Sequence, residues 1–75
     1  SGMSREQVVG QEGMVIRAGS HGEGAVRFSI PVLGNDEWMY ICREPVAVGD
    51  RVVVEDVSGN SLIVRPLDAR FGAAD

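Results

Sequence analysis

Short apolar runs alternate with glycine-containing turns along most of the chain. In the second run the apolar residues Val26, Phe28 and Ile30 are separated by polar ones, so one face of this segment is buried and the other is in water. The third run has the same two-residue period. No segment between the runs is long enough for an ordinary helix, and the pattern therefore predicts an all-β domain. Five runs have the length and the content of strands, and they cover residues 14–17, 25–33, 37–42, 51–57 and 62–65.

The best-defined turn joins the last two runs. Gly59 and Asn60 favour the positive φ that a two-residue hairpin turn requires. Counting back from this turn in strict alternation would bury the side chain of Glu55, and a buried carboxylate is costly. We therefore predict a β-bulge at Glu55 and Asp56, which turns Val53 to the outer face of its strand.

Five short strands with glycine turns are typical of a small closed barrel, because closure removes the exposed edges of an open sheet. We expect the barrel to span residues 8–66. Residues 1–7 are then an N-terminal tail that includes a processing remnant, and residues 67–75 are a C-terminal tail.

The composition and the net charge disfavour several classes of function. Hydrophobic residues make up 44% of the chain but aromatic residues only 5%, so the core must be aliphatic. All seven basic residues are arginines, and eleven acidic residues bring the net charge to -4, which opposes approach to phosphate backbones and to anionic lipid. No apolar run is long enough to span a bilayer and no signal-peptide pattern is present, so we expect a soluble domain.

Residues suited to catalysis or metal binding are few and isolated. The loop 19–24 is rich in glycine but lacks the Lys-Ser/Thr ending of a phosphate-binding loop. His21 and Glu23 in this loop have no second histidine to complete a metal site, and no serine has the sequence context of an activated nucleophile. Cys42 is the single cysteine and its predicted position is the core. We expect no catalytic residue, no cofactor and no metal.

A series of short motifs runs through residues 8–66 in a fixed order. They are Gly10-x-x-Gly13, Gly24-Ala25-Val26-Arg27, Glu37-Trp38, Glu44-Pro45-Val46 before Gly49, Val52-x-Val54-x-x-Val57-x-Gly59, and Leu62-x-Val64. In this order they resemble the C-terminal soluble domain of the NfeD family. The segment 28–36 is longer than the usual connection between the second and third strands of that family, so we expect an extended hairpin there.

The resemblance implies a fold and a class of partner. NfeD-type domains are OB-type five-stranded barrels, carried behind membrane-spanning helices that this chain does not contain. The resemblance further implies a bacterial membrane protein with this domain on the cytoplasmic side, and partners among stomatin-like and flotillin-like (SPFH) membrane scaffold proteins. It also implies a role in membrane protein quality control or in modulating a membrane protease. The serine-protease domain of longer family members has no counterpart in this sequence.

An OB-type barrel raises a second function, the binding of single-stranded nucleic acid. Such barrels often use exposed aromatic side chains on the second and third strands. Trp38 and Tyr40 would stack on bases if they faced outward, and Arg17, Arg27 and Arg43 would then line a groove. The net charge of -4 opposes this function, so we keep it as the alternative and expect no binding of nucleic acid.

A protein-binding surface follows from the expected strand order. In an OB-type barrel the fifth strand lies between the third and the fourth, so the outward residues of these strands adjoin one another. A contiguous apolar patch on a small domain marks an interaction site. We therefore predict a surface for a scaffold partner or for self-association, formed by Met39, Ile41, Val53 and Ile63.

Overall fold

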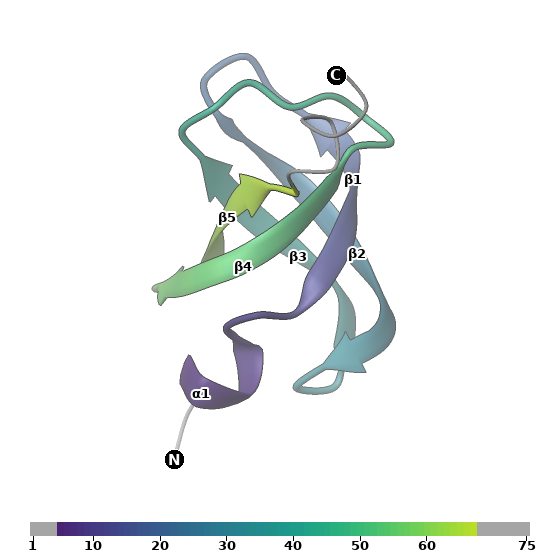
Figure 1. Ribbon diagram of the computed structural model, residues 1–75, viewed down its shortest axis with the longest axis vertical. Coiled ribbons are helices and arrows are strands. Elements are labelled where there is room, and N and C mark those ends of the chain that lie inside the picture. Colours follow the sequence, from purple (N-terminus) through teal and green to yellow (C-terminus); the bar gives the residue numbers. More distant parts are fainter. Residues whose placement is uncertain (1–4, 68–75) are drawn as a thin grey trace, which may run out of the picture.

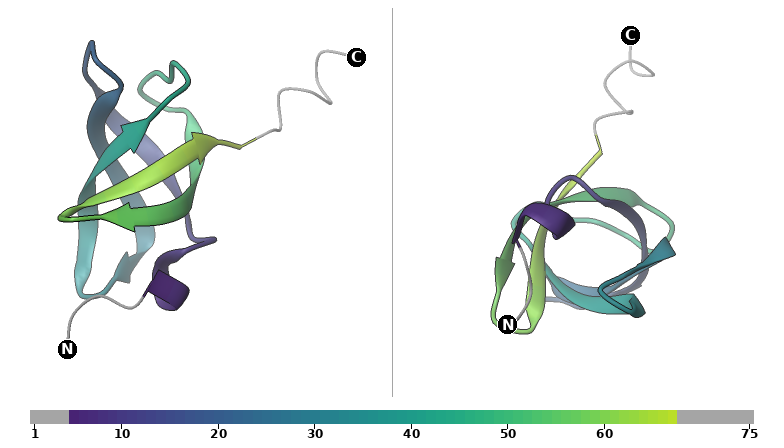
Figure 2. Two further views of the ribbon diagram at one scale, coloured as in Figure 1. Left: turned by 90° about the vertical axis from the view of Figure 1, so that its left-hand side faces the viewer. Right: turned by 90° about the horizontal axis from the view of Figure 1, so that it is seen from below.

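The computed structural model describes residues 5–67, and these residues form a barrel with one helical turn at its lower end (Figure 1). The strands close in the order β1-β2-β3-β5-β4, and the view along the barrel in Figure 2 shows the complete ring. The predicted closed five-stranded barrel is confirmed, as is the position of the fifth strand between the third and the fourth. The elements are α1 (Arg5–Val8), β1 (Glu12–Ala18), β2 (Glu23–Val32), β3 (Asn35–Cys42), β4 (Arg51–Ser58) and β5 (Ser61–Pro66).

Four of the neighbouring strand pairs are antiparallel, whereas β3 and β5 are parallel. The parallel pair arises because β5 follows the hairpin turn after β4 and is inserted beside β3. Its register places Ile41 directly opposite Ile63. This pairing controls which outward side chains become neighbours.

The core is mostly aliphatic, as the composition predicts, and Phe28 and Tyr40 are its two buried aromatic residues. Val15, Val26, Val52 and Leu62 have no exposed surface, and Tyr40 is the largest fully buried side chain. Each valine or leucine buried in this way contributes roughly 1.5–3 kcal/mol to folding.

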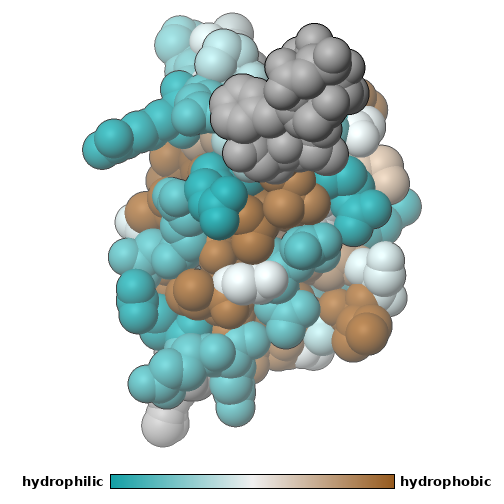
Figure 3. Space-filling view, in the orientation of Figure 1, coloured by the Kyte–Doolittle hydropathy of each residue, from teal (hydrophilic) through white to brown (hydrophobic). Residues whose placement is uncertain are grey.

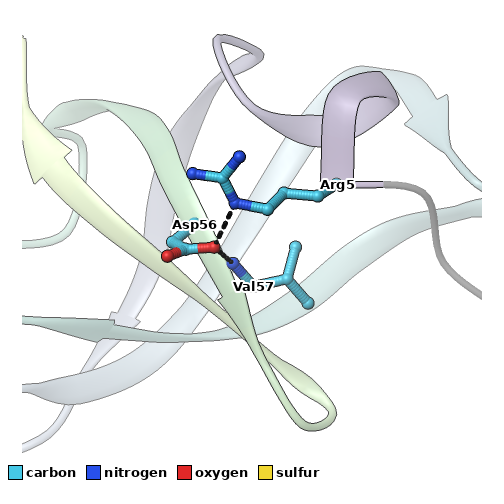
Figure 4. Close-up of polar contacts among 3 residues, drawn as sticks. All are labelled: Arg5, Asp56 and Val57. Carbon is cyan, nitrogen blue, oxygen red and sulfur yellow. Dashed lines mark hydrogen bonds and ion pairs between the residues drawn. The ribbon is translucent and has the colours of Figure 1, made fainter.

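The predicted bulge in β4 is confirmed. The register between β4 and β5 shifts between Val54 and Asp56, which leaves one extra residue on β4. Figure 4 shows that the Asp56 carboxylate accepts two hydrogen bonds through Oδ1, one from Nε of Arg5 at 2.7 Å and one from the backbone N–H of Val57 at 2.8 Å. These bonds, chiefly the one from Arg5, hold the pKa of Asp56 below its ordinary value. The bulge is therefore also the point at which α1 is held against β4.

The helical turn α1 packs against β4 at the lower end of the barrel (Figures 1 and 2). The side chain of Val8 is fully buried, and the backbone of Val54 forms hydrogen bonds of 2.9 Å with Gly10 and Gln11. Four residues are too few to show a helical period, which is why the sequence pattern does not predict α1. Residues 1–4 and 68–75 lie outside the described residues, so the proposed domain limits stay a prediction. Within the described part of the chain, no helix is long and apolar enough to cross a membrane.

The prediction that Ile30 joins the buried face of β2 is wrong. Its side chain is 76% exposed, whereas Val32 is buried. The pairing of β2 with β3 becomes irregular between Arg27 and Val32, so the two-residue period that holds through Phe28 is broken beyond it. The β2–β3 hairpin extends below the rest of the barrel (Figure 1). Ile30 is an exposed residue of this hairpin.

Candidate interaction surface

Three apolar side chains share the outer face of β3 and β5. Met39 is 49% exposed, Ile41 is 43% exposed, and Ile63 is half-buried beside Ile41. We call these three residues the β3–β5 surface. The strands hold these side chains in place because the residues that alternate with them on β3, Tyr40 and Cys42, point into the core. The surface is therefore presented on a rigid part of the barrel.

Val53 does not belong to this exposed surface, which corrects the sequence-based prediction. It lies on the outer face of β4 but is only 8% exposed. Glu12 and Arg65 lie directly opposite it on the two neighbouring strands. Each forms an ion pair, Glu12 with Arg51 at 3.5 Å and Arg65 with Glu55 at 3.2 Å. The alternation of the strand gives the direction of Val53 correctly, but the charged side chains on both sides restrict its contact with solvent.

A shallow groove continues the β3–β5 surface toward the end of the two strands. Its volume is about 480 Å³, and Ile41 and Ile63 are among its lining residues. Arg65 in the groove is ion-paired with Glu55, whereas Arg43 forms no ion pair with any described residue. Figure 3 shows apolar side chains in the middle of the face over β4 and β5, surrounded by polar ones. The groove therefore offers apolar contacts with charged groups at its rim.

Two neighbours of this surface do not follow from the sequence. Ala25 of β2 lies opposite Met39, and Arg17 of β1 lies opposite Ala25. The Arg17 guanidinium reaches across β2, with Nη2 at 3.9 Å from Sδ of Met39. The register between β1 and β2 shifts between Val15 and Arg17, and nothing in the local pattern marks this shift. The β4–β5 turn, by contrast, contains Gly59 and Asn60, and the register of its hairpin can be counted from them.

The strand order and the motifs agree with the comparisons with known proteins. The family profile described as the NfeD-like C-terminal, partner-binding domain matches residues 5–66. The chain belongs to this family. Its structure is similar to the C-terminal domain of stomatin operon partner protein 1510-C from Pyrococcus horikoshii, with a TM-score of 0.69 and 26% sequence identity over 85% of this chain and 94% of that one. The comparison with curated proteins found no match. The family description supports a role in protein interaction.

The three aromatic residues within 5–67 of this NfeD-like domain are unsuited to stacking on nucleic-acid bases. Tyr40 and Phe28 are buried, at 1% and 2% exposure. Burial also raises the pKa of the Tyr40 hydroxyl. Trp38 is half-buried against the core, and its indole N–H donates hydrogen bonds to the carbonyls of Val32 and Asn35. The stacking platform that the alternative function requires is not formed by these side chains.

The loop between β1 and β2 places His21 and Glu23 together without forming a catalytic pair. The Glu23 carboxylate accepts a hydrogen bond from the backbone N–H of His21 at 3.2 Å, and the imidazole Nδ1 lies 3.1 Å from Oγ of Ser20. Among residues 5–67, no group of three or more potential ligands is close enough to hold a metal ion. Cys42 is 3% exposed, and burial raises the pKa of its thiol, which disfavours the nucleophilic thiolate.

Proposed function

We propose that this NfeD-like domain is a non-enzymatic module that binds a stomatin-like or flotillin-like membrane scaffold protein through the β3–β5 surface. The observation that carries the proposal is the pair of large, exposed side chains Met39 and Ile41 beside the groove. The family description as partner-binding and the similarity to a stomatin operon partner protein support the class of partner.

The exposed apolar area accounts for a modest binding energy. Full burial of a methionine or isoleucine side chain contributes roughly 1.5–3 kcal/mol, so covering the exposed half of Met39 or Ile41 contributes about 1 kcal/mol each. A carboxylate in place of Ile41 would remove this contribution and would lose its hydration against the partner. We expect the affinity to fall by about tenfold or more.

Capture of a purified stomatin-like protein from the same genome tests the proposal. Ile41→Asp should abolish or strongly weaken capture. Met14→Asp is the matched control, because Met14 is 45% exposed on β1 and lies opposite Arg27 and Arg51, away from the β3–β5 surface. Capture that is unchanged by Ile41→Asp, or reduced equally by both variants, would contradict the proposed site.

The same proposal places the domain in a membrane protein, on the cytoplasmic side, where it would modulate membrane protein quality control or a membrane protease. Its support is the membership of the NfeD-like family and the similarity to a stomatin operon partner. Protease digestion of the intact protein in vesicles of known orientation tests the sidedness. Protection of the domain in inside-out vesicles would contradict it.

A further inference from the structure

The turn between β2 and β3 is apolar and exposed. Residues 30–34 have the sequence Ile-Pro-Val-Leu-Gly, and none of these side chains has a polar group. Ile30 is 76% exposed and Leu33 is 42% exposed, whereas Val32 belongs to the core. We call Ile30 and Leu33 the hairpin tip. Turns in water favour polar residues and glycine, so two exposed aliphatic side chains at this turn point to an apolar environment for the tip.

The backbone at Leu33 makes this apolar turn more unusual. Val32 pairs with Asn35, which leaves Leu33 and Gly34 as a two-residue turn with φ values of 51° and 88°. Turns of this kind favour asparagine, aspartate or glycine at the first position, and a leucine in left-handed backbone is uncommon. A polar residue would suit both the backbone and the solvent here, and the chain nevertheless has leucine. Backbone strain of this kind is concentrated at functional positions.

The polar backbone groups of the turn are partly satisfied within the domain. The indole N–H of Trp38 donates hydrogen bonds to the carbonyls of Val32 and Asn35, both at 3.2 Å. Pro31 has no N–H to donate. Lipid acyl chains offer neither donors nor acceptors, so a segment that enters a bilayer must satisfy its backbone internally. These features favour lipid over a protein partner at the tip, because a protein would supply hydrogen bonds of its own.

The hairpin tip lies at the end of the barrel at which the chain enters it. The first described element, α1, and the β2–β3 turn are at the same end in both ribbon figures (Figures 1 and 2). The family description places this domain in the C-terminal part of its proteins. Under the proposed function, the membrane-spanning part therefore precedes α1, and the hairpin tip is on the side that faces the bilayer.

The charged groups nearest the tip suit a layer of zwitterionic headgroups. Arg27 and Glu37 form an ion pair, and the charge of Asp36 also acts on Arg27. Glu37 follows Gly34 by three residues, which is about 10 Å along a strand. Segments that lie in a membrane interface bury their apolar side chains roughly 5–10 Å deep, so this ion pair would lie among the headgroups. The net charge of -4 opposes contact with anionic lipid.

We propose that the hairpin tip inserts into the surface of a zwitterionic bilayer and orients the domain on the membrane to which it is attached. This inference rests on the proposed function, which places the domain in a membrane protein. Transfer of the exposed parts of Ile30 and Leu33 out of water favours the inserted state by about 30-fold. That factor is too small to hold a free domain on a vesicle, because association costs more than this in lost freedom of motion. Attachment on the N-terminal side raises the effective concentration and makes insertion measurable.

Quenching of Trp38 fluorescence by brominated phosphatidylcholine tests the proposal. Trp38 is the single tryptophan, and its indole is hydrogen-bonded to both sides of the turn, so its fluorescence reports the position of the tip. A cysteine added before residue 1 couples the chain to maleimide lipid in vesicles. Cys42 does not compete for the maleimide because it is 3% exposed. Bromine atoms on the acyl chains should quench the attached wild type, and replacing part of the phosphatidylcholine by phosphatidylserine should weaken the quenching.

Variants at the tip and at the opposite end of the barrel are compared in the same assay. Ile30→Ser/Leu33→Asn should lower the ratio of inserted to free domain by about 30-fold, and Leu33→Asn alone by about fivefold. Both should keep the fold, because Ile30 has little buried area and asparagine suits the φ of 51° at position 33. Val48→Ser is the matched control, since Val48 is 65% exposed in the loop between β3 and β4 at the upper end (Figure 1). Its quenching should equal that of wild type.

Absence of quenching in the attached wild type, or equal quenching of wild type and the double tip variant, would overturn the proposal. Stronger quenching on vesicles with phosphatidylserine would also overturn it, because charge rather than the apolar tip would then drive the contact. In solution without lipid, the double variant should capture the stomatin-like protein as wild type does, and a loss of this capture would make the tip a protein-binding site instead. Absent quenching with retained capture would refute the lipid contact and leave the proposed function intact.

Discussion

The strained backbone at Leu33 predicts an unusual ranking of two substitutions. Leu33→Ala keeps a residue in the left-handed region, at φ 51°, and loses the partly buried side chain. Leu33→Asn loses the same side chain but introduces a residue that this turn position favours. The asparagine variant should therefore be the more stable of the two, although asparagine is the more polar residue.

The structure sets the magnitudes. The Leu33 side chain is 42% exposed, so its loss in either variant costs about 1 kcal/mol of the roughly 1.5–3 kcal/mol that a fully buried leucine contributes. Left-handed backbone costs an ordinary residue roughly 1–2 kcal/mol, and asparagine avoids much of this cost. We expect Leu33→Ala to be destabilised by about 1 kcal/mol and Leu33→Asn to match wild type within about 0.5 kcal/mol.

Urea unfolding followed by the fluorescence of Trp38, the single tryptophan, measures this difference. Near the melting temperature, 1 kcal/mol corresponds to about 4–8 °C for a domain of this size, so thermal unfolding gives an independent value. Equal stabilities of the alanine and asparagine variants would refute the presence of strain at Leu33. A lower stability of the asparagine variant would refute the assigned turn.

Two further predictions concern the fold. Gly24→Ala should destabilise the domain by about 3 kcal/mol. The reason is that the added Cβ would lie 2.1 Å from the carbonyl oxygen of Arg17 and 2.7 Å from Oη of Tyr40. A urea midpoint like that of wild type would contradict this close approach. Asp56→Asn should lower stability at pH 7, because the hydrogen bond from Arg5 lowers the pKa of Asp56 and the carboxylate therefore stabilises the fold above its unfolded pKa near 4. The contribution is lost as the pH falls through the folded pKa, so unfolding curves of the variant and wild type should converge below about pH 4, and a constant difference down to pH 2 would argue against this role.

The elements that the sequence predicts best are those with a local marker of register. The Gly59–Asn60 turn defines the phase of β4 and β5, and the cost of burying Glu55 then requires the bulge that the structure contains. The irregularity in β2 also has a local marker, because Pro31 lies within it and a proline has no N–H to donate to a strand ladder. Strict alternation disregards this signal and places Ile30 in the core, where it does not lie.

For the candidate surface, the sequence predicts which side chains point outward but not how much of each is exposed to solvent. The phase of β3 and β5 is sufficient to turn Met39, Ile41 and Ile63 outward. The exposure of Val53 depends instead on two ion pairs whose members come from three different strands. The position of Arg17 over Met39 likewise depends on the register between β1 and β2. Such contacts depend on tertiary structure and leave no periodic signal in the chain.

A titration of the isotope-labelled domain with a purified stomatin-like protein, followed by amide NMR spectra, tests most directly whether the β3–β5 surface binds the partner. We expect the largest shifts or line broadening at the amides of Met39, Ile41 and Ile63, with little change around Met14 on β1. Changes centred on β1, with the amides of β3 and β5 unaffected, would show that the partner binds elsewhere.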